Sequence, residues 1–205
     1  MPPVTTPPDL LVLHGLRVVG FCGLERLAEA TGLSHEDVES ELIDLAVSGL
    51  VTRVPGPFGG WGPTEAGRAA DAERVSAELD RAGARDLAAD THEAFEELNA
   101  EALDLCGAWQ LRPLDGVVTA NDHTDAAYDA RVLEALADLE LRTADVCAEL
   151  ALALPRFGRY RVRLARALER ARAGELDQVA DGTDSFHTVW SQLHEDLLAT
   201  LGIPR

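Results

Sequence analysis

The side chains best suited to bind a small molecule lie in three short stretches of the C-terminal half. "AWQLRP", "NDHTDAAYDAR" and "FHTVWSQLHED" each place a tryptophan or tyrosine beside histidine, asparagine, glutamine or aspartate. Aromatic walls with a few polar anchors are the usual form of a small-ligand site. We therefore predict a ligand site made of Trp109, Asn121, His123, Tyr128, Arg163, His187 and His194.

A structural interpretation of the same residues stays open. Asp122 or Thr124 would cap a helix, and Trp190 would belong to the core. His187 and His194 are seven residues apart, which places them on one helix face, where they would lie at the boundary of that core.

An arginine-rich segment is the strongest electrostatic feature of the chain. Five of its arginines recur at intervals of three and four residues and therefore share one helix face: Arg156, Arg159, Arg163, Arg166 and Arg170. One interpretation pairs this face with acids of neighbouring helices, such as Asp129, Glu134, Asp138, Glu140, Asp145 and Glu149. The other gives it a phosphate-bearing small molecule or a DNA backbone, because guanidinium binds phosphate through two parallel hydrogen bonds.

Signals of catalysis or of metal binding are weak. The chain contains no Gly-x-Ser-x-Gly, no phosphate-binding glycine loop and no His-Glu-x-x-His. Cys22, Cys106 and Cys147 are odd in number and far apart, which argues against a disulfide framework or a structural zinc site. We predict that the protein is not an enzyme and that it has no cofactor and no metal site.

The spacing of apolar residues predicts helices for most of the chain. Two short helices are expected over 9–20 and 23–32. A third begins after an N-cap at Ser34 and buries Val38, Leu42 and Leu45, which recur at i, i+4 and i+7. Two strands follow, over 50–54 and 61–64, joined by the turn "PGPFGG". Thr64 then caps a nearly continuous helix to about residue 110, with a break near "RAGARD".

The remaining residues predict a helical bundle over 84–205. Residues 110–123 read as a loop, and Thr124 is expected to cap a long helix that ends before Pro155. The arginine-rich helix follows, and "ELDQVADGTD" reads as a second loop. The last helix aligns four apolar side chains along one side: Phe186, Trp190, Leu193 and Leu197.

Composition limits the partners of the chain. The 205 residues carry a formal net charge of −18 and no lysine, so the average field repels nucleic acid and anionic membrane, although local basic patches could still bind either. No apolar run approaches the roughly 20 residues of a membrane span. The N-terminus lacks the pattern of a signal peptide. We expect a cytoplasmic protein with no membrane partner.

The order of elements gives the first half a family resemblance. Over about residues 9–75, "LERLAEATGLS…VESELIDLAVSGLVTR…GGWGPTEAGR" resembles the winged helix-turn-helix of MarR-like and GntR-like bacterial transcriptional regulators. The second half is similar to that of uncharacterised two-domain actinobacterial proteins that are usually labelled transcriptional regulators.

The resemblance implies a mainly α fold with a small β-wing. A flexible arm (1–8) would precede a winged helix-turn-helix domain (9–75) and an antiparallel helical bundle (76–205). It also implies that helices after the wing form a homodimer interface, although the apolar stripe of residues 65–110 could instead pack within one subunit. GntR-type regulators with helical effector domains bind metal through aspartate and several histidines, but this chain does not show their ordered spacing.

Charge complicates the function that the resemblance implies. Residues 1–75 carry eleven acids and five arginines, which is unfavourable for binding phosphates. The first residues of a recognition helix meet the bases, so we expect DNA contacts from Ser34, His35, Ser40 and Arg53. The predicted function is a ligand-responsive, DNA-binding transcriptional regulator that binds double-stranded DNA and a small anionic effector. The alternative is a non-DNA-binding sensor or protein-interaction module with an acidic winged helix.

Overall fold

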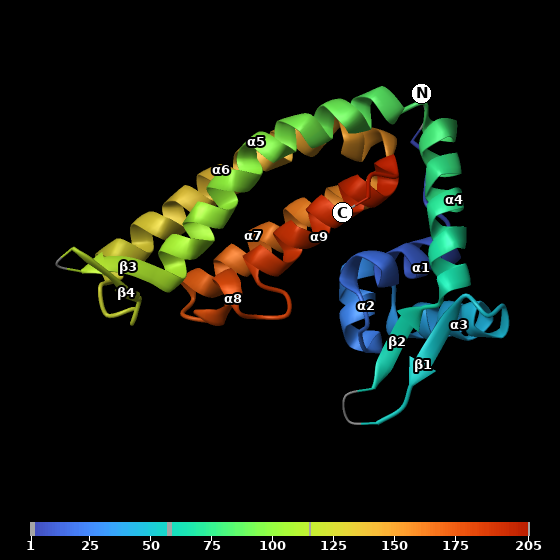
Figure 1. Cartoon of the computed structure of the whole chain (residues 1–205), viewed down its shortest axis with the longest axis horizontal. Helices are drawn as coiled ribbons and strands as arrows, with labels where there is room; N and C mark the ends of the chain where they lie inside the picture. The colour runs from blue at the N-terminus through green and yellow to red at the C-terminus, as the bar shows by residue number, and fades with distance from the viewer. Residues whose placement is uncertain (1–2, 57–58, 115, 205) are drawn as a thin grey trace. The chain divides into compact units, whose positions relative to one another are not determined.

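A computed structural model describes residues 3–56, 59–114 and 116–204. The described chain is mainly α-helical, with two small antiparallel hairpins (Figure 1). It forms two compact units: unit 1 comprises residues 1–88, 150–156 and 195–205, and unit 2 comprises residues 89–149 and 157–194. Within the described residues, no helix is both long and apolar enough to cross a membrane.

Unit 1 begins with the expected order of three helices, a hairpin and a fourth helix. The elements are α1 (Pro8–Val19), α2 (Leu24–Thr31), α3 (His35–Val47), β1 (Val51–Val54), β2 (Gly60–Pro63) and α4 (Glu65–Ala82). Ser34 and Thr64 are the N-caps of α3 and α4, as predicted, and each side chain accepts a hydrogen bond from a backbone N–H three residues later. The expected turn between the strands includes residues 57–58, which lie outside the described residues.

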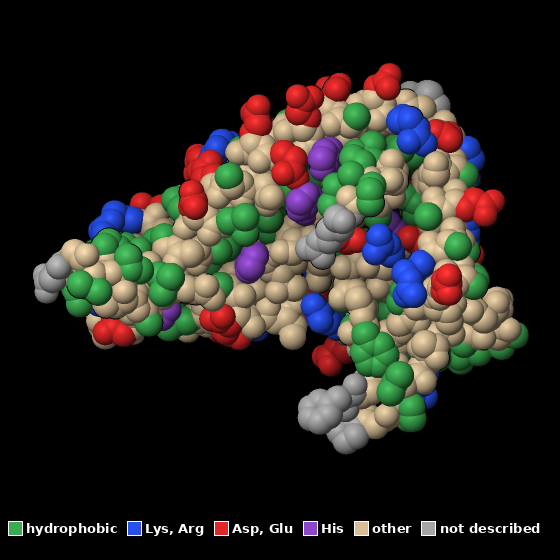
Figure 2. Space-filling view, in the orientation of Figure 1, with side chains coloured by type: hydrophobic (Ala, Val, Ile, Leu, Met, Phe, Trp, Pro, Cys, Tyr) green, Lys and Arg blue, Asp and Glu red, His purple; other side chains and the backbone are tan. Residues whose placement is uncertain are grey.

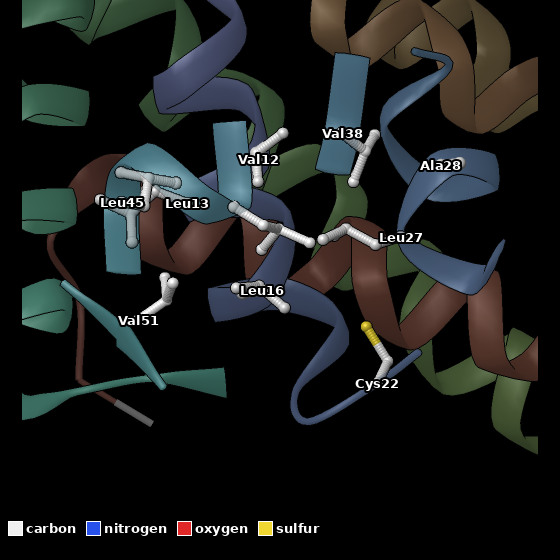
Figure 3. Close-up of a cluster of buried hydrophobic side chains, with 10 residues drawn as sticks. Val12, Leu13, Leu16, Cys22, Leu27, Ala28, Val38, Leu45 and Val51 are labelled. Carbon is white, nitrogen blue, oxygen red and sulfur yellow. The ribbon is translucent and has the colours of Figure 1, made fainter. Parts of the chain in front are cut away.

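One apolar cluster holds the elements of unit 1 together. Figure 3 shows it formed by side chains from α1, α2, α3 and the first residue of β1. Val38, Leu42 and Leu45 point into it from α3, as their spacing predicts. Residues before α1 also contact unit 1, since Thr6 is buried and the Val4 N–H donates to the Ala153 carbonyl.

The β1–β2 hairpin is attached to the helices by backbone contacts. Arg53 lies opposite Trp61 in the ladder, and Trp61 exchanges two backbone hydrogen bonds with Cys22 in the link between α1 and α2. Gly67 lies against the end of α3, because a Cβ at this position would come within 1.9 Å of the Leu50 carbonyl oxygen. The position of the hairpin is therefore set by close main-chain packing.

Unit 2 is built on four long helical segments. They belong to α5 (Arg85–Gln110), α6 (Ala126–Ala153), α7 (Gly158–Arg172) and α9 (Phe186–Leu201), with a short α8 (Asp177–Ala180) before α9. The predicted break before α5 is confirmed at Gly83, whose φ of 58° ends α4 in the left-handed conformation. The expected apolar side of α9 is buried, and its Trp190 ring stacks on Phe95 and Phe186, with centroids 4.8 and 5.7 Å apart.

Three expectations for this half are wrong in detail. Residues 110–123 were expected to form a loop but contain a hairpin of β3 (Leu111–Leu114) and β4 (Val117–Ala120). Its apolar side chains are largely exposed, so the segment lacks the in–out alternation of a half-buried strand pair. Asp125 rather than Thr124 caps α6, because its carboxylate accepts the Tyr128 N–H at 3.0 Å. The second expected loop includes α8, which is too short for a periodic pattern.

Candidate functional site

The outer face of α3 is the candidate macromolecular interface of unit 1. Since successive residues are about 100° apart on a helix, the side opposite Val38, Leu42 and Leu45 carries one stripe of four residues: Glu36, Ser40, Ile43 and Val47. All four are exposed, and the exposed fractions of Ile43 and Val47 are 52% and 85%. Three of the four side chains in this stripe are uncharged.

Most acids of α3 lie on one flank of this stripe. Asp37, Glu41 and Asp44 follow each other at intervals of four and three residues, towards Asp9 of α1. Partial burial, followed by the negative charges of Asp9, Asp44 and Asp37, raises the pKa of Glu41 above its usual value. The negative potential of the helix is therefore concentrated beside its outermost face.

The residues expected to contact DNA have different degrees of freedom. His35 and Ser40 are exposed on α3. The Ser34 hydroxyl accepts from the Asp37 N–H at 3.1 Å and donates to the Asp37 carboxylate at 2.7 Å, so it serves primarily as the helix cap. The exposed Arg53 guanidinium lies 5.6 Å from the centroid of the Trp61 ring, which holds it on one face of the hairpin.

Three of the predicted ligand-site residues meet at one end of unit 2. The Asn121 side-chain amide donates to the Trp109 carbonyl at 3.0 Å and to the Asp129 carboxylate at 2.8 Å. The His123 ring lies 4.6 Å from the Trp109 ring, and its Nδ1 lies 3.0 Å from Asp129 Oδ2. Tyr128 is close to this cluster, because its hydroxyl donates to the Ala108 carbonyl at 2.8 Å.

The cluster holds His123 in a defined state. Among the described residues, His123 is the one non-glycine with a positive φ, at 56°, a conformation that histidine adopts at some cost. With its proton on Nδ1, the ring donates to Asp129 and its Nε2 atom carries the lone pair. The arrangement presents one imidazole acceptor next to an indole, a combination suited to orienting a polar ligand.

The remaining predicted ligand-site residues have other neighbours. Arg163 pairs with Asp184 at 3.4 Å, and His187 is half-buried on the first turn of α9. His194 lies 2.6 Å from Glu96 and stacks on His92. Sequence reasoning missed His92 and Glu96, although their spacing of four residues on α5 places them on one helix face.

The arginine-rich segment does not act as one surface. Arg156 is buried in unit 1, where it contacts Glu78, Asp196 and Thr200. Arg170 pairs with Glu175 at 2.5 Å, and Arg161 raises the stability of the charged form of Glu140, whose pKa burial nevertheless shifts upward. Pairing with nearby acids is thus observed, but mostly with acids other than those anticipated.

Unit 1 also contains a buried polar network that no local pattern indicates. His14 Nδ1 lies 3.0 Å from Asp71 Oδ1, and its Nε2 lies 3.0 Å from Asp196 Oδ1. Asp196 in turn accepts from Arg156, which also contacts the fully buried Glu78. The network joins α1, α4, the 155–156 segment and the end of α9, a structural role that leaves the α3 face free.

Comparison with protein-family models, with curated proteins and with solved structures finds no match for this chain.

Proposed function

We propose that this chain is a ligand-responsive, DNA-binding transcriptional regulator with a winged helix-turn-helix at residues 9–75. The observation that carries the proposal is the exposed, largely uncharged stripe of α3, which precedes the hairpin by only a few residues. A helix that presents such a face can enter a major groove, and an adjacent hairpin with an exposed arginine can contact the backbone.

The side chains of the stripe have suitable partners on bases. Ser40 can hydrogen bond to several bases, Glu36 can accept from cytosine N4, and Ile43 and Val47 can contact thymine methyl groups. Arg53 supplies a positive charge for a phosphate. Because the acids at 37, 41 and 44 lie on one flank, their repulsion weakens binding without occupying the contact face.

The cluster of Trp109, Asn121 and His123 supports a ligand-responsive function. It combines an aromatic surface, a strained backbone and an oriented imidazole, features that concentrate at binding sites. We further propose that a small anionic molecule binds here and that the regulator acts as a homodimer, since an operator with two half-sites matches a two-fold symmetric protein.

A protein-interaction module is the second candidate function. The specific observation in its favour is the exposure of Ile43 and Val47 beside a row of acids. Exposed apolar side chains flanked by charge are also typical of protein-docking surfaces. This candidate assigns the same α3 face to a protein with a basic, partly apolar surface.

DNA binding separates the two candidates. Fluorescence anisotropy would measure binding of labelled genomic fragments across a salt series, with the wild type, Arg53→Ala and Arg81→Ala. Arg81 is a matched control because it is an exposed arginine at the other end of α4 from the hairpin.

We expect wild-type binding that narrows to particular fragments as salt rises. Arg53→Ala should weaken binding and reduce the slope of log affinity against log salt by about 1, since it removes one phosphate contact. Arg81→Ala should match the wild type. If the folded wild type binds no fragment at low salt, the DNA-binding proposal is wrong and the interaction module remains.

A further inference from the structure

A cluster of metal-ligating side chains lies within unit 2, away from the Trp109–His123 cluster in the sequence. His92 and Glu96 lie one turn apart on α5, and His194 reaches them from α9. Their ligating atoms, one from each residue, all lie within 4.8 Å of one another. Glu96 Oε1 is 2.6 Å from His194 Nε2 and 3.6 Å from His92 Nε2.

Figure 2 shows that histidine side chains gather beside acidic ones on the visible surface, where α5 and α9 lie in Figure 1. The Glu96 side chain is 43% exposed, so an ion and its water ligands can reach the carboxylate. Further acids are spread along α5 and contribute a negative potential that attracts cations.

The polar bonding of this cluster is incomplete. Within the described part of the chain, the buried Nε2 atom of His92 has no hydrogen-bond partner, and its distance to Glu96 exceeds the range of a good hydrogen bond. Buried polar atoms are normally paired, and a bound ion would satisfy this one. A simple Glu96–His194 ion pair leaves the position of His92 unexplained.

We propose that His92, Glu96 and His194 bind one divalent transition-metal ion, with zinc as the preferred ion and water completing its coordination. Two imidazoles and one carboxylate form a ligand set that zinc readily accepts, with metal–ligand bonds of about 2.0–2.2 Å. In a tetrahedral site with such bonds, ligand atoms lie about 3.3 Å apart. Small rotations of these side chains, one of them largely exposed, bring the three atoms to that spacing.

The neighbouring aromatic residues provide a readout. Phe95 stacks on Trp190 at 4.8 Å and contacts the His194 ring at 5.6 Å. Trp190 also lies one turn before His194 on α9. A paramagnetic ion such as Co²⁺ bound at the cluster should therefore quench Trp190 fluorescence.

The test uses the full chain after removal of metals with a chelator. Zn²⁺ binding would be measured by titration calorimetry, and Co²⁺ binding by visible absorption and tryptophan quenching. The variants are His92→Ala, His194→Ala and Glu96→Gln, with His187→Ala as the matched control, because His187 is another half-buried histidine of α9. Far-UV circular dichroism would verify that each variant is folded.

We expect one ion per chain and no displacement by millimolar Mg²⁺, which prefers oxygen ligands. Loss of an outer-sphere partner alone weakens metal sites by about 10–100-fold, so losing either histidine ligand should weaken binding at least about 10-fold. Glu96→Gln should weaken it as well, and His187→Ala should leave it unchanged.

Equal affinity in the wild type and His92→Ala would overturn the proposal and leave a Glu96–His194 ion pair. Displacement of the bound ion by Mg²⁺ would also overturn it, because the signal would then come from surface carboxylates. The proposal goes beyond the DNA-binding function, and neither result bears on the anisotropy experiment with Arg53→Ala.

Discussion

The buried network around His14 makes the stability of unit 1 depend on pH. His14 lies between two carboxylates, Asp71 of α4 and Asp196 of α9, and Arg156 is the other charged group that contacts Asp196. Burial lowers the pKa of His14, but the charges and hydrogen bonds of Asp196 and Asp71 together outweigh it and raise the pKa from 6.5 to about 9. The imidazole is therefore protonated at neutral pH.

A raised pKa determines the direction of the pH effect. The protonated imidazole stabilises the folded state fully below pH 6.5, where both folded and unfolded chains carry the proton. As pH rises from 6.5 through about 9, the unfolded state loses the proton first and the stabilisation is lost. A difference of about 2.5 pKa units corresponds to about 3 kcal/mol in the free energy of unfolding, to within a factor of two.

The assay is urea unfolding followed by far-UV circular dichroism at several pH values between 6 and 9, for the wild type and His14→Gln. The glutamine variant keeps a polar side chain but cannot carry the charge. It should be less stable than the wild type by several kcal/mol at pH 6, because two buried carboxylates lose their counter-charge.

The difference between the two proteins carries the test, since all other titrating groups are shared. It should shrink by about 3 kcal/mol between pH 6 and pH 9. A difference that stays constant over this range would show that His14 is not protonated between the two carboxylates, and the reasoning would be refuted.

Two further predictions concern the packing of unit 1. Gly67→Ala places a Cβ 1.9 Å from the Leu50 carbonyl oxygen and should lower the free energy of unfolding by about 1–3 kcal/mol, seen as a lower melting temperature; an unchanged temperature would mean that the main chain relaxes freely there. Arg156→Met should cost about 3–5 kcal/mol in urea unfolding, because it leaves the fully buried Glu78 and Asp196 without this arginine. A loss below about 1 kcal/mol would show that Glu78 is neutral in the folded protein.

The sequence by itself determined most of the helices and the first hairpin of this protein. Apolar periodicity, N-caps and glycines act within a few residues, so Val38, Leu42 and Leu45 and the caps at Ser34 and Thr64 are legible without a structure. The same local reading missed the β3–β4 hairpin, because its apolar side chains are exposed rather than alternately buried.

The candidate sites were only partly accessible to sequence reasoning. The Asn121–His123–Asp129 cluster lies within nine residues and was recognised as polar, whereas its contact with Trp109 depends on the packing of α5 against the start of α6. The segregation of acids to one flank of α3 follows from helix geometry, yet only the buried set showed which face is outermost.

Tertiary structure alone decided which charged side chains meet. His14 pairs with residues 57 and 182 positions away, and His194 joins His92 and Glu96 from another helix. Arg156 shares a helical period with the other arginines, but its position just before α7 places it in the buried network of unit 1. A single sequence states the charges and the helix faces, and the packing of distant segments selects the partners, because electrostatic and metal-binding interactions depend on distances that only the folded chain sets.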